Sequence, residues 1–224
     1  MSNQVAQNAE LWYYKNKNYG VLTPYIYIFL EVFMSIKRCS WADKSKLEQE
    51  YHDNKWGRPV HDDHELFKML ILEGQQAGLS WSTILKKMDA LCDAYDDFRP
   101  EKLALFDEAK MKRLLSNSGI IRNRLKVNAA VNNAKMYFKL CDNYGSLDHF
   151  LWSYVDGRPI LNHWETMQEV PANTPLSDEI SIQLKKEGFK FVGSTIVYSL
   201  MQSVGMVNDH LASCSFRFPE LKKL

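Results

Sequence analysis

Two cysteines and two histidines of this chain have the spacing of metal ligands. His210 and Cys214 are four residues apart, so on a helical turn the imidazole and the thiolate lie on one face. Cys39 and His52 form a second pair near the other end of the chain. Together they make a Cys2His2 set, which suits tetrahedral zinc in a closed, structural site. By spacing alone, two unrelated structural pairs remain at least as good an interpretation.

A carboxylate falls on an apolar helical stripe. Glu73 continues the spacing of Leu66, Met69 and Leu70, which is typical of a helix face that points into a core. A buried carboxylate is costly unless it is paired, so either the helix ends before Glu73 or the carboxylate has a function. The functional alternative is a pocket with an acid at its base, walled by nearby aromatic residues that stack on a planar ligand: Trp41, Tyr51, Trp56 and Trp81.

Basic residues are concentrated in one window. Residues 109–141 contain eight Lys or Arg and no Asp or Glu. The window also holds a turn with Gly119 between two predicted helices, followed by Arg122 and Arg124. Backbone N–H groups at a helix N-terminus bind phosphate readily, and arginines add charge-assisted contacts. The pattern favours a helix-hairpin-helix at about residues 116–124 that contacts DNA backbone; a solvated basic face is the alternative.

Composition limits the remaining choices. The chain has 224 residues, a net charge of +1 and 46% hydrophobic residues, which is ordinary for a globular protein. The apolar run at residues 21–33 contains Pro24 and Glu31, which makes it too short and interrupted for a membrane span. Four cysteines are too few for a disulfide scaffold, so we expect a reducing cytoplasm and no membrane partner.

The elements that must position these residues are predicted to be helices. Apolar residues recur every three or four positions, and no run alternates as a strand would. An all-α domain is therefore expected. Helices are predicted to begin at Asp62 or Asp63, Ser80, Pro100, Asp107, about Arg124, Ser146, Ser177 and Ser194. Residues 156–174, with Gly157, Pro159 and Pro171, are predicted to form a loop.

The domain organisation is predicted to be simple. Met34 opens a segment that differs in character from what precedes it, so residues 1–33 are interpreted as an N-terminal extension. Residues 34–224 then form a single domain. An ordered N-terminal strand or helix that packs on this domain is the alternative.

Several rare strings occur together and in order between residues 34 and 218. They are Arg38-Cys39-Ser40-Trp41, the segment 51–57 (YHDNKWG), the segment 72–81 (LEGQQAGLSW), the segment 119–124 (GIIRNR), the segment 150–153 (FLWS), the segment 189–195 (FKFVGST) and Val207-Asn208-Asp209-His210. In these strings the sequence resembles the bacterial DNA-3-methyladenine glycosylase I family, base-excision repair enzymes of the helix-hairpin-helix class.

The resemblance implies roles for particular residues. It implies structural zinc at Cys39, His52, His210 and Cys214. It implies that Glu73 and Tyr51 make polar contacts with the base and take part in catalysis, and that Trp41 and Trp81 stack on the base. It implies DNA contacts at Gln76 and Leu79 in a loop that inserts into the duplex, and at Gly119, Arg122 and Arg124 in the hairpin. Glu48 departs from the family, which often has an aromatic residue there, and places a negative charge near the predicted pocket mouth.

The resemblance also implies an activity: flipping and hydrolytic excision of N3-methyladenine from alkylated double-stranded DNA, without strand cleavage, leaving an abasic site. It suggests a monomer in the bacterial cytoplasm, associated with the nucleoid. The water-activating aspartate of other helix-hairpin-helix glycosylases is expected to be missing; Asp142 is the first acid after Lys126 and is a poor candidate. A zinc-stabilised DNA-binding module without catalysis, or an all-α small-molecule hydrolase, would be the alternatives.

Overall fold

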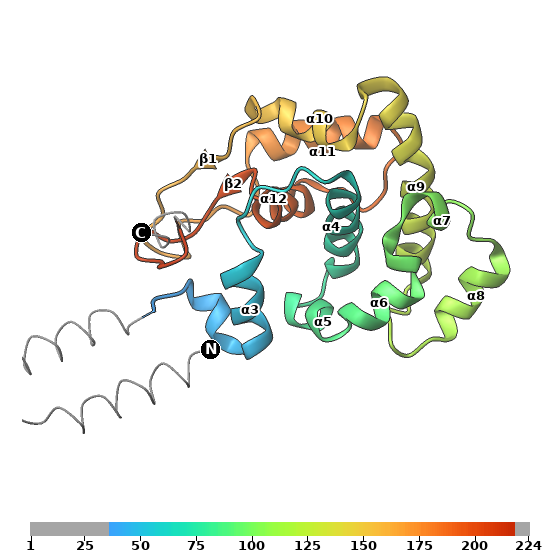
Figure 1. The fold of residues 1–224 in the computed structure, drawn as a ribbon, viewed down its shortest axis with the longest axis horizontal. Coiled ribbons are helices and arrows are strands. Elements are labelled where there is room, and N and C mark those ends of the chain that lie inside the picture. The colour runs from blue at the N-terminus through green and yellow to red at the C-terminus, as the bar shows by residue number, and fades with distance from the viewer. Residues whose placement is uncertain (1–35, 218–224) are drawn as a thin grey trace, which may run out of the picture. The chain divides into compact units, whose positions relative to one another are not determined.

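The computed structural model describes residues 36–217. The predicted extension at residues 1–33 lies outside the described residues, and one compact unit begins at Arg38. Within the described residues the chain is mainly helical, which confirms the all-α prediction (Figure 1). The α-helices are α3 (Lys46–Asn54), α4 (Asp63–Gln76), α5 (Trp81–Lys86), α6 (Met88–Ala94), α7 (Pro100–Leu103), α8 (Glu108–Ser116), α9 (Arg124–Tyr144), α10 (Leu147–Trp152), α11 (Pro175–Lys186) and α12 (Ser194–Ser203). Three 3₁₀ turns are η1 (Ser40–Lys44), η2 (Asp96–Phe98) and η3 (Ser153–Val155).

Most of the predicted helix starts are confirmed by their caps. Asp62, Ser80, Asp107 and Ser146 each accept a hydrogen bond from a backbone N–H in the first turn of the helix that follows. Pro100 stands at the first position of α7, where its missing N–H costs nothing. Local sequence signals therefore fixed these boundaries.

Two starts were predicted incompletely. Ser177 is not the N-cap of α11: Thr174 is, Pro175 follows it, and Ser177 is the third residue of a reciprocal capping box. The cap of α9, which the sequence reading did not name, is Asn123, whose side-chain oxygen accepts from the N–H groups of Leu125 and Lys126.

The helix predicted from Ser80 is divided in two at Lys87. That residue has φ −107° and ψ 4°, between α5 and α6. Its ammonium donates to the carbonyl oxygens of Ser118 and Gly119, at 2.9 and 3.1 Å. Lys87 thus connects the junction of α5 and α6 to the glycine turn between α8 and α9.

Helix α4 lies among the other helices and packs against α5, α9, α10 and α12 (Figure 1). Leu66, Phe67, Leu70 and Leu72 on this helix are almost fully buried. Each such side chain contributes on the order of 1.5–3 kcal/mol by leaving water. Residues carried by α4 are therefore held in fixed positions.

The predicted loop at 156–174 contains a short strand. Strand β1 (Ile160–Leu161) pairs in parallel with β2 (Val207–Asn208). The buried Asp209 carboxylate beside β2 accepts hydrogen bonds from Asn162, Trp164, Tyr198 and Gln202, at 2.6–2.8 Å. Four neutral donors satisfy the buried charge and attach the 160–164 segment to α12. No helix among residues 36–217 is long and apolar enough to cross a membrane.

The C-terminal end of α12 lies directly against the segment that precedes α4. Gly57 N–H donates to Gln202 O and Val60 N–H to Val204 O, both at 3.1 Å. Gly205 directly follows Val204 with φ +72°, and a Cβ there would clash with the backbone of Arg58 and Pro59. Backbone cannot move aside as a side chain can, so only glycine fits.

We expect Gly205→Ala to lower the free energy of unfolding by about 3 kcal/mol or more, because it combines positive φ with a backbone clash. Gly145→Ala is the matched control: φ is +86°, but a Cβ there meets nothing within 4 Å. It should cost only about 1 kcal/mol. Urea unfolding of both variants measures the difference, and equal losses would contradict the close-approach argument.

Candidate active site and metal centre

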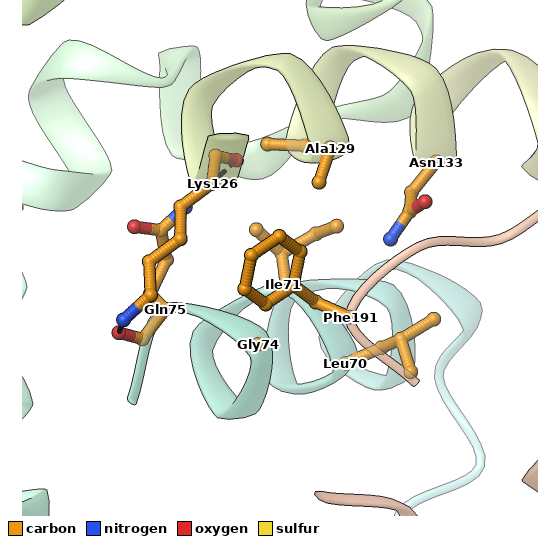
Figure 2. A pocket seen from close by; sticks show the side chains of 9 residues that line it. Leu70, Ile71, Gly74, Gln75, Lys126, Ala129, Asn133 and Phe191 are labelled. Carbon is orange, nitrogen blue, oxygen red and sulfur yellow. Dashed lines mark hydrogen bonds between the residues drawn. The ribbon is translucent and has the colours of Figure 1, made fainter. Parts of the chain in front are cut away.

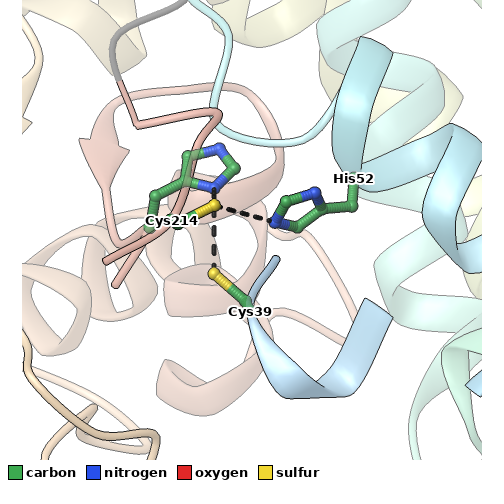
Figure 3. A group of neighbouring side chains, drawn as sticks. Cys39, His52 and Cys214 are labelled. Carbon is green, nitrogen blue, oxygen red and sulfur yellow. Dashed lines mark hydrogen bonds between the residues drawn. The ribbon is translucent and has the colours of Figure 1, made fainter. Parts of the chain in front are cut away.

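The four predicted metal ligands converge. Cys39 directly precedes η1, His52 lies in α3, and His210 and Cys214 lie in the segment after β2. All four are buried, and their ligand atoms lie within 4.8 Å of one another. Figure 3 shows Cys39, His52 and Cys214 turned toward a common point. The spacing argument thus correctly selected four residues that meet in space.

The distances between ligand atoms suit a tetrahedral ion. Cys214 Sγ lies 3.5 Å from His52 Nε2 and 3.4 Å from His210 Nδ1, and Cys39 Sγ lies 3.8 Å from His210 Nδ1. Tetrahedral bonds of about 2.0–2.3 Å to two N and two S atoms would place these atoms about 3.3–3.8 Å apart. These three distances match a tetrahedral site, and the cluster has the donors to hold a metal.

Outer contacts orient the ligands. His52 Nδ1 is 2.9 Å from Asp53 Oδ1, and Asp53 in turn accepts a bidentate interaction from Arg38. Burial raises the pKa of Asp53, but its hydrogen bonds with Arg38 and His52 outweigh that and hold the pKa below its ordinary value. The N–H groups of Leu211 and Phe216 donate to the sulfurs of Cys39 and Cys214. Hydrogen bonds of this kind, from neighbouring groups to the ligand side chains, are typical of metal sites.

An aromatic cluster adjoins the ligands. Trp41 and Tyr51 are close neighbours in sequence of Cys39 and His52. The ring centroid of Tyr51 is 6.4 Å from that of Trp41 and 5.1 Å from that of Trp81. The Trp41 ring meets Trp56 edge-on at 5.1 Å. The predicted stacking residues therefore lie together: Trp41 is close in sequence to the ligand Cys39, and Trp81 comes from α5.

Glu73 belongs to this cluster. Helix α4 continues to Gln76, so the interpretation in which the helix ends before Glu73 is wrong, and its side chain is 5% exposed. Burial raises the pKa of Glu73 to about 8, opposed by the Ser203 hydroxyl on α12. The pKa of Tyr51 is raised well above its ordinary value, first by burial and second by the Glu73 charge. The two predicted catalytic residues thus interact electrostatically.

Two polar atoms in the cluster lack partners. Among the described residues, Tyr51 Oη and Trp81 Nε1 are buried without a hydrogen bond. Buried polar atoms in native structures are nearly always satisfied, so each exception calls for an explanation. Two donors and a carboxylate among aromatic rings form a site that can stack a flat ring and hydrogen-bond its edge.

A small cavity on another face of α4 is separate from this cluster. It is lined in part by Leu70, Ile71 and Gly74 of α4 and by Ala130 of α9, and Figure 2 shows it. Its volume of about 10 Å³ holds about one water molecule. That is far below the roughly 300 Å³ of a small-molecule pocket, so it is not a substrate site.

The loop after α4 is a tight turn. Leu79 N–H donates to Gln76 O at 2.6 Å, and Gln76 Nε2 donates to Leu79 O. Ala77 has φ −42° and ψ 117°, and Gly78 has φ +77°, which together define a type II turn. Leu79 is 37% exposed. The predicted DNA-contacting residues Gln76 and Leu79 thus flank the tip of a rigid turn.

A turn connects α8 to α9 at the position of the predicted hairpin. Asn117 Oδ1 accepts from Gly119 N–H at 2.8 Å, and Ile120 anchors the turn in the core. Arg122 and Arg124 are exposed, as DNA contacts require. Lys126 is an exception within the basic window: it is 6% exposed and binds backbone carbonyls of α4. Charge counting alone could not have separated it from the exposed cations.

Glu48 has a local role. It lies in the first turn of α3, 6% exposed, where its carboxylate accepts from the Ser45 hydroxyl at 2.8 Å. A negative charge is favourable at a helix N-terminus. Its place in the capping turn accounts for an acid at this position. Asp142 is exposed near the end of α9.

Some residues of the site were not identified from the sequence. Ser203 sits in an apolar helix with no spacing signal. Arg38 and Asp53 lie in the family-like segments 38–41 and 51–57, but only the folded structure shows that they pair. Asp209 directly precedes a predicted ligand, and that adjacency was the one available hint.

Comparisons with known proteins agree with this geometry. The family model described as methyladenine glycosylase matches residues 41–218. DNA-3-methyladenine glycosylase 1 of Escherichia coli strain K12 is 45% identical over 179 residues, covering 80% of this chain and 96% of that protein. DNA-3-methyladenine glycosylase of Haemophilus influenzae is 42% identical over 177 residues, covering 79% and 96%.

A solved structure is similar as well. It is a tyrosine-to-phenylalanine variant of a 3-methyladenine DNA glycosylase I in complex with 3-methyladenine. It superposes with a TM-score of 0.78 at 39% identity and covers 80% of this chain and 97% of that one. By family match, by identity over nearly the whole length of its relatives and by fold, this chain belongs to the methyladenine glycosylase family.

Proposed function

We propose that this protein is a monofunctional DNA glycosylase that flips N3-methyladenine out of alkylated DNA and hydrolyses its glycosidic bond, leaving an abasic site. The proposal rests on the buried Glu73 beside Tyr51 and Trp81, whose Oη and Nε1 atoms have no hydrogen-bond partner among the described residues. Relatives of this chain are named for that activity, and a similar structure contains 3-methyladenine.

The chemistry follows from the substrate. An adenine methylated at N3 carries a positive charge, so its bond to the sugar is already weak and the base leaves without strong acid catalysis. Aromatic faces attract an electron-poor ring, and an opposite charge nearby favours the ionised form of Glu73. Catalysis then rests on binding the departing base better than the intact nucleotide, with Glu73 and Tyr51 contacting its polar edge and Trp41 and Trp81 its faces.

Two exposed elements would hold double-stranded DNA. Gly119, Arg122 and Arg124 in the hairpin would bind phosphates, as helix N-termini and arginines do. Gln76 and Leu79 would enter the duplex where the flipped nucleotide leaves a gap. The net charge of +1 is compatible with this role because residues 109–141, which include the hairpin, carry eight Lys or Arg and no acid.

Structural zinc is the proposed occupant of the Cys2His2 cluster. Two thiolates and two imidazoles are the donors that tetrahedral zinc prefers, and with all four positions filled by protein the ion supplies cross-linking and no reactive water. Cys39, His52, His210 and Cys214 would hold it. We further propose a monomer that acts on nucleoid DNA in a bacterial cytoplasm, as the bacterial relatives and the four free cysteines suggest.

Release of 3-methyladenine from methylated duplex DNA tests the function directly. We expect Glu73→Gln to lower the excision rate by about 100-fold or more, since a neutral amide cannot stabilise a cationic base. Glu187→Gln is the control: that glutamate is 8% exposed but contacts Asn143, Tyr144 and Gln183 outside the pocket. Unimpaired excision by Glu73→Gln would refute the proposed role. No excision by the wild type would instead favour a DNA-binding module without catalysis.

Glu73 should also make stability depend on pH. Its pKa is about 8 in the folded protein and near 4.5 when unfolded, so the folded state retains the proton longer. The stability this provides is complete below about pH 4.5 and is lost as the pH rises through 8; the full change is roughly 5 kcal/mol at most. We therefore expect Glu73→Gln to gain stability relative to wild type between pH 5 and 8. Urea unfolding of both proteins at pH 5 and at pH 8 measures this gain. A difference in free energy of unfolding that stays the same at the two pH values would contradict the burial argument.

Metal content checks the zinc assignment. Atomic emission should find about one zinc per wild-type chain, and Cys39→Ser should lose both the metal and several kcal/mol of stability. Cys92→Ser, at a cysteine outside the cluster, should retain the zinc and unfold as the wild type does. Metal-free wild-type protein with unchanged thermal stability would exclude a structural ion.

A further inference from the structure

Lys126 forms a buried link between α9 and the end of α4. Its ammonium donates to Gln75 O at 2.8 Å and to Ala77 O at 2.6 Å. In return, Gln75 Nε2 donates to Lys126 O at 3.3 Å. Figure 2 shows the lysine side chain extending from α9 to Gln75. Three hydrogen bonds thus connect Lys126 with Gln75 and Ala77, which lie about 50 positions earlier in the sequence.

The link is electrostatically unusual. Burial lowers the pKa of Lys126, and its two hydrogen-bond acceptors are backbone carbonyls rather than carboxylates. A cation in the first turn of α9 is opposed by the dipole of its own helix. What stabilises the charge is the negative end of α4, where terminal carbonyls lack helical partners. The lysine is therefore suited to the end of α4 and poorly suited to its own helix.

The carbonyl that Lys126 binds decides the type of turn at residues 76–79. In type I and type II turns the central peptide differs by a flip of about 180°, which reverses the direction of its carbonyl. Here that carbonyl belongs to Ala77, and Gly78 has the positive φ that type II requires. The ammonium at 2.6 Å stabilises the type II form, because a flip would remove its acceptor.

We infer that Lys126 is a positioning residue that locks the 76–79 turn in its type II form and fixes it relative to the hairpin. Lys126 lies three residues beyond Asn123, the last residue of the hairpin turn, so one helical turn connects the two elements proposed to contact DNA. This inference rests on the proposed function, since it concerns how Gln76 and Leu79 meet the duplex.

The two sides of α4 should affect free-base binding and duplex excision separately. Glu73 and Gln75 lie on one helix but face different sides: Glu73 interacts with Tyr51, whereas Gln75 lines the small cavity with Lys126. Loss of the ammonium should therefore disturb the turn while the pocket for the free base stays intact. Single-stranded DNA, whose bases are already unstacked, should depend less on the turn than duplex DNA.

Lys126→Met tests this, because methionine keeps much of the apolar stem and removes the ammonium. We expect excision from methylated duplex DNA to fall tenfold to a hundredfold, about the effect of a small misplacement. Excision from single-stranded DNA should fall less, and the Kd for free 3-methyladenine, from Trp fluorescence, should stay within about twofold. Lys139→Met is the matched control: it removes the same charge from an exposed position on α9, about 22 Å farther along the helix than Arg124. It should behave as the wild type does.

A second pair of variants addresses the turn without touching the core. Gly78→Ala and Gly78→Asn both have open space for a side chain, since nothing lies within 4 Å of a Cβ there. Alanine disfavours positive φ more than asparagine does. We expect Gly78→Ala to lose more duplex excision than Gly78→Asn, with free-base binding unchanged in both.

Three outcomes would overturn the inference. They are duplex excision by Lys126→Met within twofold of wild type, an equal loss on single and double strands, and a parallel loss of free-base binding, which would show a merely structural lysine. Should Lys126→Met fail to fold, equal duplex excision by the two Gly78 variants would count against it in the same way. Failure of the proposed function is distinguishable, because the wild-type protein would then release no 3-methyladenine.

Discussion

The meeting of Cys39 and His52 with His210 and Cys214 is the constraint on which the site depends. It joins residues up to 175 positions apart and brings the beginning and the end of the described domain to one point. Trp41 and Tyr51 lie within two residues of the first two ligands, so fixing the ligands also fixes the aromatic walls. Arg38 and Asp53 extend the same constraint outward through His52. A structural centre and a recognition site thus share their supporting residues.

The second organising feature is the conflict between burial and charge at Glu73. A leucine at this position would give α4 a more stable core face, because the carboxyl must be held away from water with few donors. Under the proposed function the bound base is a cation, and its positive charge would offset that cost. Tyr51 Oη and Trp81 Nε1, without partners of their own, belong to the same arrangement. Together these groups place a carboxylate and two hydrogen-bonding atoms among aromatic rings.

The sequence predicted the features that depend on local spacing. Asp62, Asp107 and Ser146 cap their helices because a cap is defined within four residues. The stripe from Leu66 to Glu73 was predictable for the same reason. Lys87, Lys126 and Asp209 were not, because their partners lie 31 or more residues away for the lysines and on several elements for the aspartate. The ligand set lies between these cases: each pair had a recognisable spacing, but only the fold shows that the pairs meet.

The burial of the two ligand thiols has a chemical consequence. Cys39 is 0% exposed and Cys214 is 7% exposed, and each sulfur also accepts a backbone N–H. Electrophiles that methylate adenine attack thiolates as well, since a thiolate is the most nucleophilic group a protein offers. A repair enzyme for alkylated bases is needed when such reagents are present. The fold buries both sulfurs of the Cys2His2 cluster, which limits the access of such reagents to the residues that join the two ends of the described domain.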